Sequence, residues 1–564
     1  MSRKFVVGLL VALALATYWN ALRTPFVWDD DSAITTNASI RDIAASLNTT
    51  LETPLAGRPI VSLSFALNYA YGQLDTLGYH VVNLAIHIAN ALILFGIVRR
   101  TLRRQVGDRW ALSPDAVGLA ASVIWLVHPL VSETIDYTTQ RTESLMGLFF
   151  LLTLYASIRA RDVKRQKRLW TGVAIASCAA GMATKESMVI APIAVLLYDV
   201  VFQFESPGQA FAARRVLYAG FAATWVELAF IMWRWPRTTV GGTSASSMNY
   251  ALNQAEMIAR YLRLSVWPGA LVADYGVPRP LHLGDVFPQL AFIGVLVVLT
   301  IVALVRWPAF GFLGAMFFLT LAPTSSVVPI LTEVGAERRM YLPLAAVVVL
   351  AVVLAARASQ HWRNTATAAL IVVAGALAIR TVVRNRDYES ALTLWKSVVD
   401  VRPQGRARFA YGNELLALGR HEEATAQLRL AVVDNADAKA GLGTALLMQG
   451  NIEEGIGVLQ SFVDANPSLP NRVPARALLG RAHQALAERA LTQRDTALAA
   501  NEARKAIEFD ANNAGAHNAL GAALASQGDL PAAIVEFKAA IRLNPTMESA
   551  LNNLAHATAM VQGR

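Results

Sequence analysis

The stretch FVVGLLVALALATYWNALRTPFVWDDD, residues 5–31, joins an apolar run of membrane length to a cluster of three acids. Phe5–Leu22 is long enough to cross a bilayer as a helix, and residues 24–28 hold the acids close to the membrane surface. Carboxylates cost free energy beside hydrocarbon, so at this place they usually mark a site that needs them. We therefore predict an active site at the outer end of the first helix. The alternative is that the acids only cap that helix.

Composition assigns the chain to a broad class before any motif does. Hydrophobic residues make up 55% of the sequence and charged residues only 16%, and the apolar residues crowd into residues 1–380. This balance excludes a wholly soluble globule. The formal net charge of +10 does not indicate a nucleic-acid partner, because Lys and Arg lie mainly in short loops between apolar runs. The single cysteine, Cys178, rules out an intramolecular disulfide.

Eleven apolar runs predict eleven membrane-spanning helices. They are residues 5–22, 81–98, 111–130, 142–158, 169–183, 188–202, 216–233, 287–305, 310–321, 341–356 and 365–379. The basic loops 99–109 and 159–168 are typical of the cytoplasmic side, which also places the N-terminus inside. We expect the first run to be an uncleaved anchor rather than a signal peptide, since cleavage would free the acids from the membrane. Residues 60–71 and 255–267 predict surface helices in two long external loops.

The C-terminal part carries an internal repeat, which is the most specific signal in the sequence. In Ala514–Pro545 the small and apolar positions match the tetratricopeptide consensus at His517, Leu520, Gly521, Leu524, Ala533, Phe537, Ala540 and Pro545. Earlier copies begin near Tyr411, Leu442 and Leu479, the last with an insertion at residues 488–495. Gly and Ala let paired helices pack closely and Pro ends each second helix, so these copies predict an α-solenoid.

The chain is thus predicted to be all-α and to consist of two domains. A polytopic membrane domain takes residues 1–380, and a tetratricopeptide-repeat domain takes residues 381–564. Because the number of spans is odd, the repeats lie on the non-cytoplasmic side, with the acids. Residues 391–403 fit the second helix of one further repeat, whose first helix is the last span. The concave face of such a solenoid offers a groove for an extended polypeptide. A self-packed spacer or an oligomerisation arm is the alternative.

An acidic pair after the first of many spans, followed by a repeat solenoid, resembles the GT-C superfamily of glycosyltransferases. Within that superfamily the chain looks most like the transmembrane and tetratricopeptide repeat O-mannosyltransferases and their bacterial relatives. The local matches are residues 25–30, 57–59, 79–84 with His87, 128–129 with Glu133, 185–186 and 337–343. Their order and spacing carry the resemblance, which covers nearly the whole chain.

The resemblance implies an enzyme that moves a sugar from a polyisoprenyl-phosphate donor to an acceptor hydroxyl. The expected acceptor is Ser or Thr of a protein that the repeats engage. Asp29 or Asp30 would act as general base while the other carboxylate supports the sugar. We expect Asp30 to be the base and Asp29 its support, with Asp31 a bystander.

The departing phosphate needs cations close to it. The residues expected to supply them are Arg338, Arg339, Arg58 and Lys185. Each could instead pair with a carboxylate or contact lipid headgroups. The acidic and polar residues expected to support the site are Glu133, Asp136, Glu186 and His80. A divalent cation, Mg²⁺ or Mn²⁺, could bind Glu133 and Asp136 with Asp29, although the sequence shows no dedicated ligand set.

Two other functions stay open at this point. The same fold could transfer sugar to a lipid or polysaccharide, or the chain could be a non-catalytic membrane scaffold whose repeats assemble an envelope complex. In a bacterium the predicted topology places a multi-pass protein in the inner membrane with periplasmic repeats. In a eukaryote the repeats would lie in the lumen of the endoplasmic reticulum.

Overall fold

The computed structural model describes residues 2–105, 112–236, 247–326, 329–330, 332–358, 363–465 and 472–562. These residues form helices joined by short turns and loops, and the chain divides into two compact units, Met1–Val401 and Arg402–Arg564. The first unit therefore continues beyond residue 380, where composition places the end of the membrane domain.

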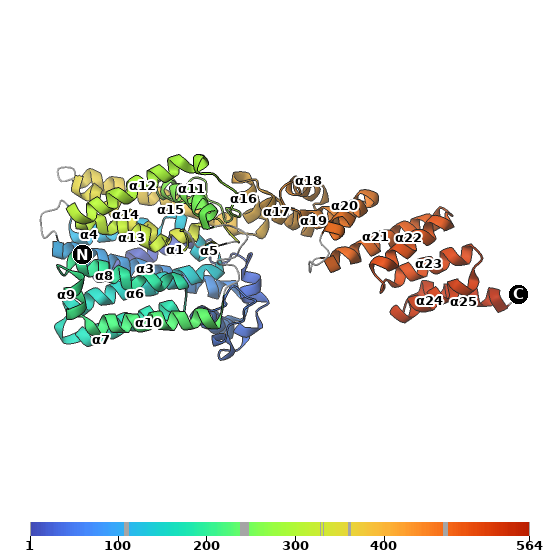
Figure 1. Cartoon of the computed structure of the whole chain (residues 1–564), viewed down its shortest axis with the longest axis horizontal. Coiled ribbons are helices and arrows are strands. Elements are labelled where there is room, and N and C mark those ends of the chain that lie inside the picture. Colours follow the sequence, from blue (N-terminus) through green and yellow to red (C-terminus); the bar gives the residue numbers. More distant parts are fainter. Residues whose placement is uncertain are drawn as a thin grey trace. The chain divides into compact units, whose positions relative to one another are not determined.

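The first unit is a bundle whose long helices lie side by side (Figure 1). They are α1 (Arg3–Tyr18), α3 (Thr76–Gln105), α4 (Pro114–Leu126), α6 (Arg141–Asp162), α7 (Lys167–Met182), α8 (Ala191–Phe202), α10 (Arg215–Arg234), α12 (Leu283–Arg306), α13 (Pro308–Leu321), α14 (Pro343–Ala358) and α15 (Arg363–Asn385). Each lies on one of the predicted spans, the first residue of 111–130 being outside the described residues. Among the described helices, five are long and apolar enough to cross a membrane, or up to seven if each of two bent pairs is one span. The number of eleven spans stays a prediction.

One of the bent pairs turns the chain back into the bundle. Helix α4 and the segment Pro129–Asp136, which ends in α5 (Glu133–Asp136), meet at an angle of 60°, and Pro129 is the first residue after the break. Proline has no backbone N–H and cannot continue the hydrogen bonding of the preceding turn. The His128 side chain instead accepts the backbone N–H of Leu130 at 3.1 Å. The bend places the acids of α5 inside the unit rather than at its surface.

The segment after α1 is irregular but packed. It contains three single turns, η1 (Asp31–Thr35), η2 (Ala38–Arg41) and η3 (Ala45–Leu47), and leads into α2 (Pro59–Gly72). Apolar side chains of η1, η2 and α2, together with Leu55, pack against Tyr79 of α3 and Leu145 of α6. A helix is present at both predicted surface positions, α2 at residues 60–71 and α11 (Ser247–Val266) at residues 255–267. Packing against the bundle therefore holds the loop that carries the acids in place.

The second unit consists of paired helices, as the repeats predict. They are α17 (Gly405–Ala417), α18 (His421–Ala431), α19 (Ala438–Met448), α20 (Ile452–Ala465), α21 (Arg472–Thr492), α22 (Thr496–Phe509), α23 (Ala514–Ser526), α24 (Leu530–Leu543) and α25 (Glu548–Gln562). The insertion at 488–495 lengthens α21 to 21 residues. A helix also forms at 391–403, α16 (Ala391–Val401), which belongs to the first unit.

The close approach of α23 and α24 gives a test of the repeat packing. A Cβ on Gly521 would lie 2.6 Å from the Phe537 ring and 3.1 Å from the Ala533 carbonyl, so Gly521→Val should destabilise the repeats by about 1–3 kcal/mol. In α20, Gly457 has open space around its Cβ position, and Gly457→Ala should be neutral or stabilising by about 0.4–1 kcal/mol. Thermal unfolding of the purified chain followed by circular dichroism measures both, and equal effects would contradict this account of the packing.

Candidate active site

The two neighbouring acids at the end of α1 have different surroundings. Asp30 is fully buried. Its carboxylate accepts the backbone N–H groups of Val27 at 3.1 Å and Thr139 at 2.7 Å, and also the Thr139 hydroxyl. Burial raises the pKa of Asp30 to about 7, although these hydrogen bonds act in the opposite direction. Asp30 thus ties the segment after α1 to the residues that precede α6.

Asp29 faces a different environment from Asp30. It is half-buried, and its backbone N–H donates to the Tyr137 hydroxyl at 3.0 Å. Within the part of the chain that the structure describes, no donor contacts its carboxylate. Asp31 is exposed and bonds locally to Thr35. Of the three acids, Asp29 is therefore the one whose carboxylate is both reachable and without a hydrogen-bond donor.

An aromatic clamp, formed by Trp28, Tyr137 and Trp395, fixes the direction of Asp29. The Trp28 and Tyr137 rings are stacked with an interplanar angle of 4° and centroids 6.1 Å apart. Trp395 of α16 packs against Trp28 with centroids 5.1 Å apart. Trp28 has a φ of 53°, a left-handed conformation that costs a non-glycine residue of order 1–3 kcal/mol. The stacking holds Trp28 in this conformation, which sets the orientation of the next residue.

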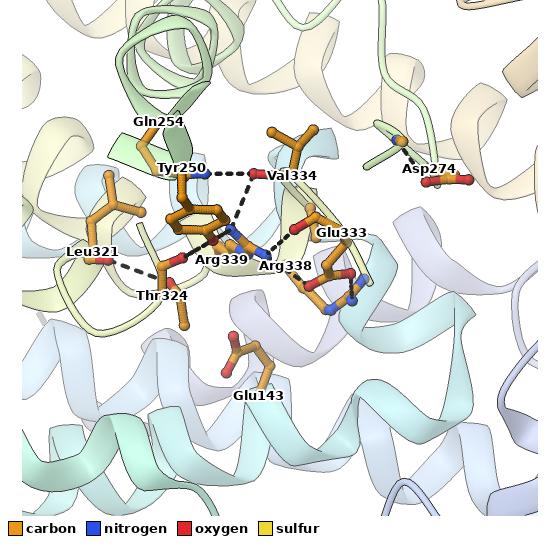
Figure 2. Close-up of polar contacts among 12 residues, drawn as sticks. Glu143, Tyr250, Gln254, Asp274, Leu321, Thr324, Glu333, Val334, Arg338 and Arg339 are labelled. Carbon is orange, nitrogen blue, oxygen red and sulfur yellow. Dashed lines mark hydrogen bonds and ion pairs between the residues drawn. The ribbon is translucent and has the colours of Figure 1, made fainter. Parts of the chain in front are cut away.

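The arginines expected to bind the donor phosphate are paired with carboxylates. The Arg338 Nη1 contacts Glu133 Oε1 at 2.6 Å, and its other terminal nitrogen bonds to Glu333. Arg339 contacts Glu333 at 3.0 Å and the Thr324 carbonyl at 2.9 Å, as Figure 2 shows. Burial alone would raise the pKa of Glu333, but the two guanidinium groups override it and hold that pKa at about 2. The two arginines and two glutamates form one neutral network.

The other two expected cations are paired as well. Lys185 lies 2.7 Å from Glu143 of α6, and Arg58 lies 3.8 Å from Glu186. Lys185 therefore forms its closest ion pair across the bundle with Glu143 and not with the adjacent Glu186. In Figure 2 Glu143 rises from its helix below the arginines, with its carboxylate turned away from Arg338 and Glu333. All four cations expected at the donor phosphate thus already have carboxylate partners.

The residues expected to support the site are buried and engaged in different ways. Glu133 also accepts the backbone N–H of Arg338 at 2.8 Å, which joins α5 to the turn η8 (Glu337–Met340). Asp136 is fully buried. His80 is buried between the Ile135 carbonyl at 2.9 Å and Thr24. Across the described ranges, no three or more His, Cys, Asp or Glu side chains gather where they could hold a metal ion.

Several residues of the site escaped the sequence reasoning. Thr139, Tyr137 and Glu333 show no local pattern that marks them, and Trp395 fits a repeat position that does not indicate a role in the site. Glu143 did give a signal, since a carboxylate inside an apolar run is a functional candidate. Arg384 gave a similar one near the end of the last apolar run. It is fully buried and lies 3.3 Å from Glu337, the residue before Arg338.

An apolar groove leads away from the arginines through the bundle. It has a volume of about 780 Å³ and is lined by α3, α6, α8, α13 and α14. Leu342, two residues after η8, lines it, while Gln105 and Arg357 line it where α3 and α14 end. Representative lining residues are Leu94, Phe150, Leu154, Phe312, Met316 and Val349. The groove has the length and chemistry to take a hydrocarbon chain.

Segments in both parts of the chain match known protein families. Residues 60–233 match the family described as dolichyl-phosphate-mannose-protein mannosyltransferase. Residues 377–435, 412–470 and 485–548 match the tetratricopeptide repeat. Similar curated proteins are a protein O-mannosyl-transferase of Caenorhabditis elegans, 22% identical over 70% of this chain, and protein O-mannosyl-transferase TMTC4 of Mus musculus, 26% identical over 75% of this chain.

The chain spans 57% of the length of the worm protein and 65% of the mouse protein. A solved structure that aligns with it is ArnT from Cupriavidus metallidurans bound to undecaprenyl phosphate, with 15% identity and a TM-score of 0.37. That alignment covers 81% of this chain and 80% of the other. The family matches and the curated relatives confirm the expected resemblance: in its membrane part and in its repeats the chain resembles the transmembrane and tetratricopeptide repeat O-mannosyltransferases.

Proposed function

We propose that the chain is an integral-membrane glycosyltransferase that moves a sugar from a polyisoprenyl-phosphate donor to Ser or Thr of an acceptor protein. The observation that carries the proposal is the Asp29 carboxylate. It is reachable, lacks a hydrogen-bond donor among the described residues and is aimed by a rigid aromatic clamp. A general base needs a free lone pair in a fixed direction, and Asp29 meets both conditions.

In this reaction the acceptor oxygen attacks the anomeric carbon and gives its proton to Asp29. The bond between that carbon and the phosphate oxygen breaks, and the phosphate leaves with the electron pair. Asp30 is less suited as the base, because its oxygens already accept hydrogen bonds from Val27 and Thr139 and its side chain is fully buried. The proposal therefore reverses the roles expected from the sequence and makes Asp30 a positioning residue.

On the donor side, the apolar groove would hold the prenyl chain and bring the phosphate to the cations beside Leu342. Arg58 keeps 14% of its side chain exposed, Arg338 keeps 13% and Lys185 keeps 10%, whereas Arg339 keeps 2%. Arg58, Arg338 and Lys185 can therefore reach a phosphate, and Arg339 serves to fix Glu333. Because all three reachable cations are paired, the phosphate would bind by displacing a carboxylate from them.

The repeats would engage the acceptor polypeptide on the non-cytoplasmic side, which is the periplasm in a bacterium. The O-mannosyl-transferase relatives and the repeat match support this assignment. The odd number of predicted spans places the repeats and Asp29 in one compartment. The described acids do not gather into a metal site, and the proposed steps use only side chains of the chain.

Substitution of each acid separates the proposed roles. Asp29→Asn should lower kcat for transfer from a lipid-linked sugar to a Ser/Thr peptide by roughly 10²–10⁴-fold, with an unchanged melting temperature. Asp30→Asn should lower the activity because it shifts Asp29 out of position. Asp31→Asn should have the activity of the parent. Full activity of Asp29→Asn would contradict the assignment. If the parent transferred sugar to a lipid but not to the peptide, the assignment of Asp29 as the base would stand and the protein acceptor would be refuted.

The pKa of Asp30 predicts a pH-dependent stability. Its pKa rises from 3.8 to about 7 on folding, so it stabilises the fold below pH 4 and this contribution is lost as the pH rises to 7. Asp30→Asn has no such titration. Its melting temperature relative to the parent should therefore increase between pH 4 and pH 8. Burial also raises the pKa of Glu337 to about 7. Because Glu337 is present in both proteins, its contribution cancels in the difference between their melting temperatures. A constant difference would show that Asp30 is already ionised at pH 4.

The clamp predicts a positioning role for Trp395. Trp395→Ala should release Trp28 and lower kcat by roughly 10- to 100-fold while KM for the donor stays the same, because the base is misplaced but the groove is intact. Trp395→Phe keeps an aromatic ring against Trp28 and should restore most of the activity. The matched control is Trp267→Ala, at a tryptophan that is 73% exposed, and it should keep the activity of the parent. A loss of donor affinity in Trp395→Ala, or no rescue by Phe, would refute this role.

A further inference from the structure

A second pocket lies at the far end of the first unit from Asp29. It has a volume of about 390 Å³, and Arg161, Lys167, Arg214 and Arg215 are among its lining residues. Helix α6 begins beside Thr139 and ends at Asp162, a length of roughly 33 Å at about 1.5 Å per residue. The pocket is therefore separated from the site at Asp29 by the length of a membrane-spanning helix.

Only one of the four cations in this pocket is neutralised. Arg214 contacts the buried Asp199 at 2.6 Å and donates to the Ser157 carbonyl at 2.9 Å. Among the residues that the structure describes, no carboxylate pairs with Arg161, Lys167 or Arg215. Four positive charges thus share one cavity with a single nearby carboxylate of the described chain, Asp199, which pairs with Arg214 and also attracts Arg161.

The Arg161 side chain is held in a defined position in spite of this. Its guanidinium lies 4.3 Å from the centroid of the Phe204 ring, an attractive arrangement for a cation. Asp162, the nearest acid along the chain, is taken up by Arg100 and Arg104 of α3. The described structure therefore leaves the charges of the pocket available to a ligand from outside, and that ligand should carry negative charge.

The surface around the pocket indicates where the ligand comes from. Large apolar side chains beside it are exposed, Val216 of α10 by 72% and Leu169 of α7 by 59%. Farther along α10, Val226 is 71% exposed. In a membrane protein such faces contact lipid tails. A molecule with a phosphate in the pocket would lay its apolar part along α7 and α10.

We propose that this pocket binds the headgroup of an anionic phospholipid. The lipid phosphate would contact the exposed side chains of Arg161, Lys167 and Arg215, while the acyl chains follow the apolar faces of α7 and α10. Basic pockets between membrane helices attract anionic lipids in this way. The site is independent of the sugar transfer proposed at Asp29 and requires no donor or acceptor.

The test is native mass spectrometry of the full chain in neutral detergent, with phosphatidylglycerol or phosphatidylcholine added at equal concentration. The parent should retain phosphatidylglycerol in preference to phosphatidylcholine. K167Q/R215Q should lower the affinity for phosphatidylglycerol about tenfold or more. The matched control is R165Q/R168Q, which removes two charges beside Lys167 from positions that do not line the pocket. It should bind as the parent does, and K167R/R215K should restore binding.

The outcomes separate the possible explanations. Equal losses in the two glutamine variants would mean that overall charge attracts the lipid, and would overturn the pocket. Equal retention of the two phospholipids would overturn it as well. Competition by inorganic phosphate or glycerol phosphate at the affinity of the lipid would assign the pocket to a soluble phosphate and refute the lipid. Melting temperatures measured without lipid confirm that each variant is folded.

Discussion

The buried carboxylate of Asp30 is the constraint on which the rest of the candidate site depends. A carboxylate removed from water needs hydrogen-bond donors, and Val27 and Thr139 supply them. These bonds close the segment after α1 into a tight turn. Trp28 takes the left-handed conformation within that turn, and Asp29 is left facing outward. The reachable acid owes its position to the buried one.

The buried cations of the site also need partners, and carboxylates supply them as ion pairs. Arg338 is shared between Glu133 and Glu333, and Lys185 is paired with Glu143. An unpaired charge would be costly in this interior, so each of these buried cations needs a partner. Under the proposed function, a donor phosphate competes with these carboxylates. Such competition weakens the binding of the phosphate, which suits a carrier that has to leave after each transfer.

The positions of the helices could be predicted from the sequence, but the side-chain contacts of the site could not. Apolar length and repeat spacing are local properties, so every predicted span and repeat coincides with helices. The roles of Asp29 and Asp30 could not be separated, because successive residues of a tight turn point in different directions. The role of Trp395 in the site could not be predicted, since its contact with Trp28 joins distant parts of the chain. Glu143 was within reach, because a carboxylate in an apolar run is itself a signal.

The short helices beside the apolar groove have a consequence for the surrounding bilayer. Helices α13 and α14, of 14 and 16 residues, measure roughly 21 and 24 Å at about 1.5 Å per residue. The hydrocarbon layer of a typical bilayer is about 30 Å thick. Under the prediction that both helices span the membrane, lipids next to them would compress to match them. A long-chain carrier lipid would therefore meet the groove where the membrane is thinnest and where the path of its headgroup to the surface is shortest.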